Sequence, residues 1–272
     1  MKHIAWIVLA IALSGCDKID QPFTETPTGG GGPNPQTYIR KVLIEDFTGA
    51  ACKNCPDAAN TAKNIQKNLY PGKVVVMAIH SGFFAVPGGP FPYDFRTPEG
   101  EQLATDFGVQ AYPNGMVNRS TFGLATSVVG HGEWASRTDS LLKLPAVATI
   151  NIANAYNDVT RVISTTITTK ALTALTGTFK LATFYLEDSL IKPQLNGSVL
   201  DPNYVHMHAL RGAFAGTYGE TVFNNAAAND SIIKPYSLTI KADAVSKNCI
   251  VVAYLYDDTT KEIVQVEEKH FD

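Results

Sequence analysis

The chain has 272 residues, of which 45% are hydrophobic, and its formal net charge is −3 at pH 7. A mildly acidic chain without a basic block excludes nucleic-acid binding and electrostatic binding to anionic lipid as main functions. The length and the hydrophobic fraction are typical of one large or two ordinary globular domains.

The N-terminal segment has the composition of a secretory signal. Met1-Lys2-His3 is a short basic region, residues 4–13 are apolar, and the segment ends with small residues at Ser14-Gly15 before Cys16. The apolar run is too short to span a bilayer, which favours a signal peptide at residues 1–15. This segment, which ends at Cys16, resembles the lipobox of bacterial lipoproteins. This resemblance implies that Cys16 carries a covalent lipid anchor; the alternative is an ordinary signal peptide with an incidental cysteine.

Residues 16–37 are predicted to form a lipidated tether. The stretch is rich in Pro, Gly and Thr and contains four consecutive glycines. It has too little apolar surface to offset the entropy of ordering the chain. We therefore expect a flexible segment that holds the folded part near the membrane.

From Tyr38 to about residue 144 the sequence alternates between strand and helix patterns. An unbroken β-branched run at residues 74–79 indicates a strand in a sheet that is covered on both faces. Further strands are predicted at residues 42–47 and 115–118, and helices at residues 52–69, 98–107 and 133–142.

The segment Cys52-Lys53-Asn54-Cys55 follows the first predicted strand and opens the first predicted helix. This order resembles the thioredoxin superfamily, in which a strand delivers a Cys-x-x-Cys pair to the start of a helix. Asp46-Phe47 stands before the pair, as in that superfamily, and Tyr112-Pro113 stands where the superfamily has a cis-proline. The resemblance implies a thioredoxin-like α/β domain over residues 38–144 with a cis bond before Pro113.

Two functions of the cysteine pair remain open. In a redox-active pair, Cys52 is the nucleophile, Cys55 is the resolving thiol and Asp46 accepts the proton; the helix N-terminus and Lys53 stabilise the thiolate. In a structural pair, Cys52 and Cys55 form a permanent disulfide, which is the resting state expected of an exported dithiol without a reducing partner. Ala51 stands where thioredoxins usually have Trp, and this departure counts against oxidoreductase activity.

Residues 81–98 form an insertion that is longer than a thioredoxin requires. Its aromatic residues are Phe83, Phe84, Phe91, Tyr93 and Phe95. A Gly- and Pro-rich loop cannot bury these rings in a core of its own. We therefore expect interdomain packing for them, and binding of a peptide, protein or glycan where they are exposed. With the Tyr112-Pro113 loop, Phe83, Phe84, Phe91 and Tyr93 are the candidate partner-binding residues.

Beyond residue 145 the chain is rich in Thr, Val, Ile and Tyr, often in period two. Strands are predicted at residues 147–155, 159–170, 178–187, 205–214, 232–242 and 248–257. This spacing predicts an antiparallel β-sandwich with immunoglobulin-like proportions over residues 145–272. The predicted fold class is therefore α/β followed by all-β.

No metal site is predicted. His206 and His208 would face one side of a strand and share a metal, but no third ligand is evident, so an ordinary polar strand face is the prediction. Cys249 lies beside an apolar run and is expected to be a buried free thiol.

Four segments together resemble the Omp28-related outer-membrane lipoproteins of Bacteroidetes. They are the lipobox at Cys16, VLIEDFTGAACKNCPDAA, YPNGMVNR and HMHALRGAFAGTYGE. The resemblance implies a thioredoxin-like domain and a β-sandwich-like domain attached to the outer membrane, with no settled activity. We predict an interaction module, such as an accessory lipoprotein of an outer-membrane transporter or assembly machine, with no cofactor besides the lipid on Cys16. The alternative is a membrane-tethered thiol-disulfide oxidoreductase that acts on exported proteins.

Overall fold

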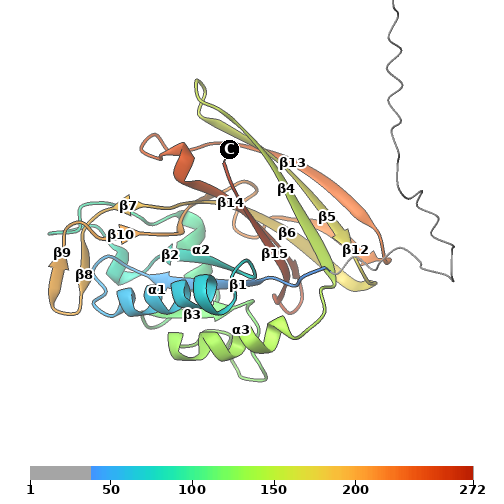
Figure 1. The fold of residues 1–272 in the computed structure, drawn as a ribbon, viewed down its shortest axis with the longest axis horizontal. Helices are drawn as coiled ribbons and strands as arrows, with labels where there is room; N and C mark the ends of the chain where they lie inside the picture. Colours follow the sequence, from blue (N-terminus) through green and yellow to red (C-terminus); the bar gives the residue numbers. More distant parts are fainter. Residues whose placement is uncertain (1–37, 272) are drawn as a thin grey trace, which may run out of the picture. The chain divides into compact units, whose positions relative to one another are not determined.

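The structure is a computed structural model that describes residues 38–271 (Figure 1). The predicted signal peptide at residues 1–15 and the predicted tether with its lipidated Cys16 at residues 16–37 lie outside the described residues. Among the residues that are described, no helix combines the length and the apolar character needed to cross a membrane.

The first half of the described chain alternates strands and helices, as predicted. Its elements are β1 (Val42–Thr48), α1 (Cys55–Asn64), β2 (Val74–His80), α2 (Pro98–Asp106), β3 (Asn114–Val117) and α3 (Trp134–Leu142). Helix α1 begins later than the predicted start at residue 52. Pro56 occupies its first turn, where the fixed φ and the missing N–H of proline suit a helix start. The helix continues as a π-helical turn at Ile65–Leu69.

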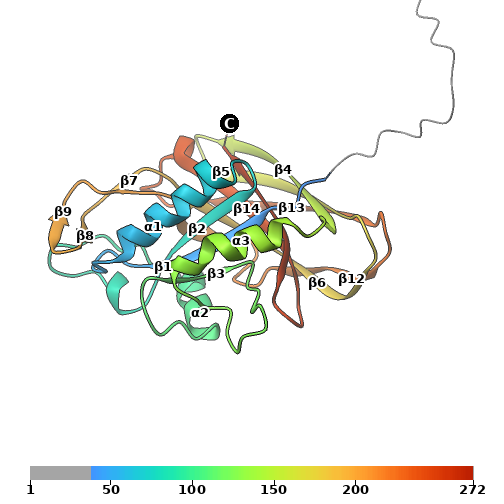
Figure 2. The same ribbon diagram turned by 60° about the horizontal axis from the view of Figure 1, so that its bottom comes forward.

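Strands β1 and β2 are neighbours in the sheet, with β3 at its edge beside β1. β1 pairs with β2 in parallel and with β3 in antiparallel. Every residue of β2 is buried, as its apolar run predicts, and every residue of β1 is buried as well. Helices α1 and α3 pack on one face of these strands, and α2 contributes to the core on the other face (Figure 2).

The second half of the chain is almost entirely β-structure. Its strands are β4 (Ala148–Asn157), β5 (Val162–Ala171), β6 (Leu175–Glu187), β7 (Leu190–Ile191), β8 (Gln194–Asn196), β9 (Val199–Asp201), β10 (Val205–His206), β11 (Ala209–Ala213), β12 (Glu220–Ala226), β13 (Ser231–Thr239), β14 (Cys249–Asp257) and β15 (Ile263–His270). The strand predicted at residues 205–214 is divided into β10 and β11, because His208 adopts a positive φ of 55° between them. Strands β7, β12 and β15 and the β8–β9 hairpin were not predicted.

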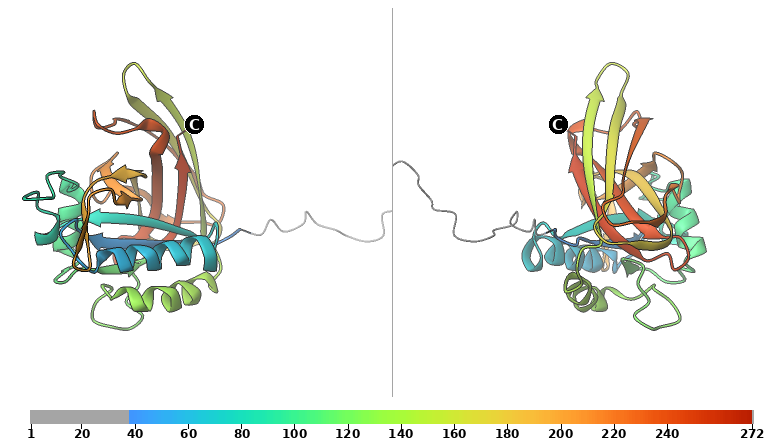
Figure 3. Two further views of the ribbon diagram at one scale, coloured as in Figure 1. Left: turned by 60° about the vertical axis from the view of Figure 1, so that its left-hand side comes forward. Right: turned by 90° about the vertical axis from the view of Figure 1, so that its right-hand side faces the viewer.

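One sheet crosses the predicted domain boundary at residues 144 and 145. Its strand order is β15-β14-β6-β11-β2-β1-β3, and β12 also pairs with β6. The link is β11, which pairs with β2 in parallel and with β6 in antiparallel. A second, three-stranded antiparallel sheet has the order β13-β5-β4 and shares a hydrophobic core with β6 and β14 (Figure 3). The fold is therefore mixed α/β, with mostly strands, a few helices and several sheets.

A buried ion pair connects the two halves. The guanidinium of Arg119 donates to the carboxylate of Glu45 on β1, with Nη2 at 2.6 Å from Oε1, and both side chains are fully buried. The same nitrogen donates to the hydroxyl of Tyr254 on β14 at 2.6 Å. The ring of Phe107 lies 4.8 Å from the guanidinium carbon. Because Glu45 and Tyr254 come from different halves, Arg119 holds the two halves together in the interior.

Candidate functional site

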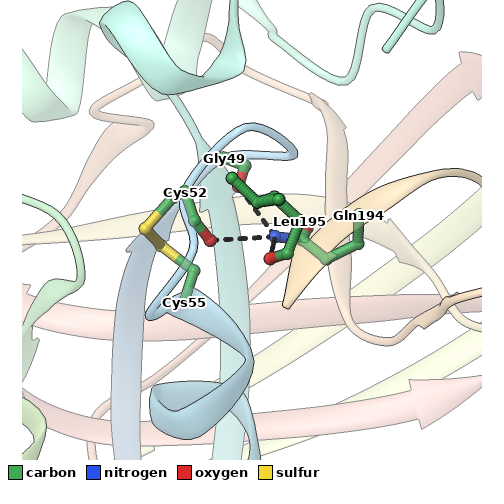
Figure 4. The surroundings of a disulfide bond; sticks show 5 residues. All are labelled: Gly49, Cys52, Cys55, Gln194 and Leu195. Carbon is green, nitrogen blue, oxygen red and sulfur yellow. Dashed lines mark hydrogen bonds between the residues drawn. A yellow bond between two sulfur atoms is a disulfide. The ribbon is translucent and has the colours of Figure 1, made fainter. Parts of the chain in front are cut away.

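The cysteine pair lies at the C-terminal end of β1 and forms a disulfide bond, which confirms the predicted pairing (Figure 4). The Cα atoms of Cys52 and Cys55 are 5.4 Å apart. The N–H of Cys52 donates to the carbonyl of Gly49 at 3.0 Å and closes a turn before α1. Each cysteine is only 2% exposed, so little of the disulfide is open to an external thiol.

Gln194 on the β8–β9 hairpin covers the disulfide loop. Its side-chain amide donates to the carbonyls of Gly49 and Cys52, at 3.3 and 3.1 Å (Figure 4). The backbone N–H of Leu195 donates to the carbonyl of Ala50 at 2.9 Å. The hairpin is therefore hydrogen-bonded to the loop through a buried side chain and through its backbone.

The other side of the loop packs against the insertion. The N–H of Ala51 donates to the carbonyl of Phe84 at 3.0 Å. At Gly49 a Cβ atom would lie only 2.5 Å from the carbonyl carbon of Phe84, so only glycine fits this close approach. The disulfide loop is thus enclosed between two segments that are distant from it in the sequence.

The predicted partner-binding aromatics fall into two groups. The first group, which we call the aromatic patch, consists of Phe83, Phe84 and Tyr112; their successive ring centroids are 5.6 and 6.1 Å apart. Phe83 is 83% exposed. The Tyr112–Pro113 peptide bond is cis, as predicted. The aromatic patch therefore adjoins the cis-proline loop, and it reaches the disulfide loop through the backbone of Phe84.

The second group packs inward. Phe91 and Tyr93 lie against a small core that includes the buried Phe95. The hydroxyl of Tyr93 donates to the carboxylate of Asp243 in the second half of the chain. The expected packing on the second half is confirmed for this group, whereas Phe83 is left on the surface.

A cavity of about 340 Å³ lies beside α1. Its walls are α1 and residues 204–208, and the ends of β1 and β2 also line it. Cys55 contributes to the lining together with Asp46, so the three predicted redox residues lie close together, with Cys52 bonded to Cys55. The small side chains of Ala59 and Ala78 help to leave this space open.

Several polar atoms in the lining are buried and have no hydrogen-bond partner in the described part of the chain. Asp46 is 2% exposed, its Oδ1 is unpartnered, and burial raises its pKa to about 7. Both ring nitrogens of His80 are unpartnered; burial, followed by the nearby His206 and Arg211, lowers the His80 pKa well below its usual value. Burial also lowers the pKa of His206 to about 4. Both imidazoles are therefore neutral at pH 7, and Asp46 is about half ionised there.

Sequence reasoning missed His80 and Gln66 as lining residues. Asp46 pairs with Ala78, and Thr48 pairs with His80, across the parallel strands. The period of two places these side chains on the α1 face of the sheet. A polar residue that ends an otherwise apolar strand was the available signal for His80. No local signal indicated that residues 204–208 would cover this face.

The two histidines considered for metal binding have different polar surroundings. Both line the cavity, but His206 is buried beneath it, while His208 pairs with Asp188 through Nδ1 and Oδ1 at 3.1 Å. Within residues 38–271, no group of three or more His, Cys, Asp or Glu side chains is placed to hold a metal ion. Cys249 is a buried free thiol, as expected, and burial raises its pKa to about 12.

Together these features define a mixed α/β protein in which an oxidised cysteine pair at a strand end is covered by a hairpin. The sequence profile described as outer membrane protein Omp28 matches residues 100–272. The chain belongs to the Omp28 family, as predicted, and the protein is therefore located at the outer membrane. The matched residues contain the YPNGMVNR and HMHALRGAFAGTYGE segments but begin after the cysteine pair.

Two solved structures from Porphyromonas gingivalis are similar to the chain. HBP35 is 18% identical, with 87% of this chain and 76% of that chain covered and a TM-score of 0.67, which shows a shared fold. A domain of the outer membrane lipoprotein Omp28 is 24% identical, with 47% of this chain and 89% of that chain covered and a TM-score of 0.34. No curated protein sequence matches the chain.

Proposed function

We propose that this protein is an interaction module of the outer membrane, anchored by a lipid on Cys16, in which the Cys52–Cys55 disulfide is structural. The observation that carries the proposal is the enclosure of the disulfide: each cysteine is 2% exposed and Gln194 bonds directly to the loop. Thiol-disulfide exchange requires a thiolate to attack a sulfur atom directly. Because hydrogen-bonded backbone covers this cysteine pair, a permanent structural disulfide is favoured over a redox active site.

The proposal includes a thioredoxin-like arrangement for residues 38–144, followed by a β-sandwich for residues 145–272. The order β1-α1-β2-α2-β3-α3 and the cis bond before β3 support the first part. Two antiparallel layers with a common core support the second part. In this arrangement β11 takes the sheet position beside β2, so the second half completes the sheet of the first half.

The aromatic patch is the proposed partner-binding surface. Phe83 is 83% exposed and Val86 in the same loop is 49% exposed, while the backbone beneath them is hydrogen-bonded to the disulfide loop. Exposed aromatic residues on a rigid support are the usual anchors of protein interfaces. The partner is a protein, peptide or glycan of the cell envelope, such as a component of a transporter or an assembly machine.

Pull-down from detergent-solubilised envelopes tests this proposal. We expect the wild-type lipoprotein to recover a defined partner and Phe83→Ser to lose it. Val159→Ser removes a side chain that is 93% exposed at a remote turn, and it should bind like the wild type. Equal recovery by all three proteins, or repeated recovery of nothing, would refute the assignment of the patch.

The second candidate function is a tethered thiol-disulfide oxidoreductase. The observation that favours it is Asp46, which lines the same cavity as Cys55 and has a pKa of about 7, a value suited to proton transfer. Insulin reduction or disulfide isomerisation distinguishes the candidates. Turnover that disappears in Cys52→Ser would favour the enzyme, and equal background rates would favour the interaction module.

A further inference from the structure

The cavity beside α1 presents more polar atoms than the protein itself satisfies. Asp46 Oδ1, both ring nitrogens of His80 and both amide atoms of Gln66 have no hydrogen-bond partner within residues 38–271. None of the three residues is more than 3% exposed, and all three line the cavity. Buried polar groups in native proteins are nearly always paired. Such a group of unpaired atoms around an open space indicates a place where another molecule supplies the missing partners.

The size and the remaining lining suit a small organic molecule. The cavity volume of about 340 Å³ lies at the lower end of the range of ligand sites, roughly 300–1,000 Å³. Apolar groups of Pro56, Val76 and Met207 also contribute to the wall. An apolar wall with a few convergent polar groups is the usual composition of a ligand site. A molecule built on two fused rings fits such a space.

Basic residues give the lining its charge. Lys63 on α1 and Lys67 on the following turn are exposed residues in the lining, one helical turn apart. Asp46 is the acidic residue of the lining, and burial raises its pKa to about 7, so it is mostly protonated in mildly acidic solution and about half ionised at neutral pH. Lys67 also faces Glu268, which makes Lys63 the better position for an anionic group.

We propose that this cavity binds a small amphiphilic organic anion. The apolar body of the ligand lies against Pro56 and Val76, neutral donors or acceptors of the ligand bond to Asp46, His80 and Gln66, and its negative group lies at Lys63. This binding activity is separate from partner binding by the aromatic patch, so either one stands if the other fails.

Saturation-transfer NMR on the full-length lipoprotein in detergent micelles tests the proposal, with empty micelles as the blank. The probes are indole-3-acetate and its neutral analogue indole-3-acetamide, which have nearly the same shape. We expect saturable binding of indole-3-acetate. Because Lys63 is exposed and screened, Lys63→Gln should weaken indole-3-acetate binding by only about three- to fivefold and leave indole-3-acetamide unchanged.

Cavity-filling variants locate the binding site. Ala59→Phe places a ring inside the cavity and should weaken both probes by about tenfold or more. Ser140→Phe adds the same ring to an exposed position of α3 and should have no effect. Asn60→Phe, at an exposed lining position, replaces Ala59→Phe if circular dichroism shows that the latter is unfolded.

Three results would overturn the inference. They are the absence of saturable binding to the wild type, binding that survives in the folded cavity-filling variant, and indole-3-acetate binding that does not change in Lys63→Gln. The first two would show a cavity that holds only water, and the third would remove the anion from the proposal.

Discussion

The protonation of Asp46 gives a quantitative test of the site. Its carboxyl group is buried at the end of β1, and its pKa is raised from 3.8 to about 7 by burial. An acid whose pKa is higher in the folded state holds its proton longer in that state than in the unfolded chain. The folded state is therefore favoured at low pH, and this contribution to stability is lost as the pH rises from about 3.8 to about 7.

The size of the effect follows from the two pKa values. Each pKa unit corresponds to about 1.4 kcal/mol of unfolding free energy. About two units separate pH 5 from the folded-state pKa of about 7, and above that pH both states are ionised. Asp46 should therefore destabilise the wild type by about 3 kcal/mol between pH 5 and pH 9. The side chain that Asp46→Asn introduces does not ionise in this range, so the unfolding free energy of this variant should not show this decrease.

Urea denaturation at about pH 5 and pH 9, with the disulfide kept oxidised, measures the difference. The advantage of Asp46→Asn over the wild type should grow by about 3 kcal/mol between the two conditions. Any effect of the new amide on stability that does not depend on pH is equal at the two pH values, so it cancels in this comparison. Asp57→Asn, which changes an exposed carboxylate in the first turn of α1, is the control. A growth of less than about 1 kcal/mol would contradict the assignment of a buried, protonated Asp46.

Three further substitutions test the packing of the site. Gln194→Ala removes the two side-chain hydrogen bonds to the disulfide loop, each worth about 0.5–1.5 kcal/mol, so it should cost about 1–3 kcal/mol. It should also speed reduction of the disulfide by dithiothreitol, which maleimide trapping detects, whereas Asn196→Ala at the exposed hairpin tip should not. Glu45→Gln removes one charge of a fully buried ion pair and should lower the unfolding free energy by about 3–5 kcal/mol in urea denaturation; a loss under about 1 kcal/mol would refute the pairing. Gly49→Ala places a Cβ atom within 2.5 Å of the Phe84 backbone and should lower the melting temperature. Gly88→Ala places its Cβ atom in open space and should have the same melting temperature as the wild type.

Local patterns in the sequence were sufficient for the central elements. The β-branched run of β2 predicts a strand buried on both faces, and every one of its residues is buried. Period-two alternation likewise located β4 and β5, because a strand with one face on a core must alternate. Strand β6 was located by its apolar and aromatic residues, and its second half is buried on both faces. The start of α1 was less accurate, because the turn at Cys52 resembles the first turn of a helix in composition.

The enclosure of the disulfide was not predictable, because it depends on contacts between distant residues. Gln194 lies 142 positions from Cys52, and β8 and β9 are three residues long with no strong strand pattern. The same reason applies to Arg119, which lies 74 positions from Glu45 and 135 positions from Tyr254. Each of these residues sits in an ordinary loop or strand pattern, and only the assembled sheet brings them together.

The cavity and the covered disulfide adjoin each other through Cys55 and Gln194. Gln194 lines the cavity and also donates to the loop that contains Cys52. A movement of the β8–β9 hairpin that exposes the disulfide must therefore also remove part of the cavity wall. A ligand that needs this wall binds only the closed state, and it stabilises that state in proportion to its concentration. On the proposed ligand binding, occupancy of the cavity should therefore slow reduction of the disulfide, as suits a binding protein rather than a catalyst that must expose its sulfurs at each turnover.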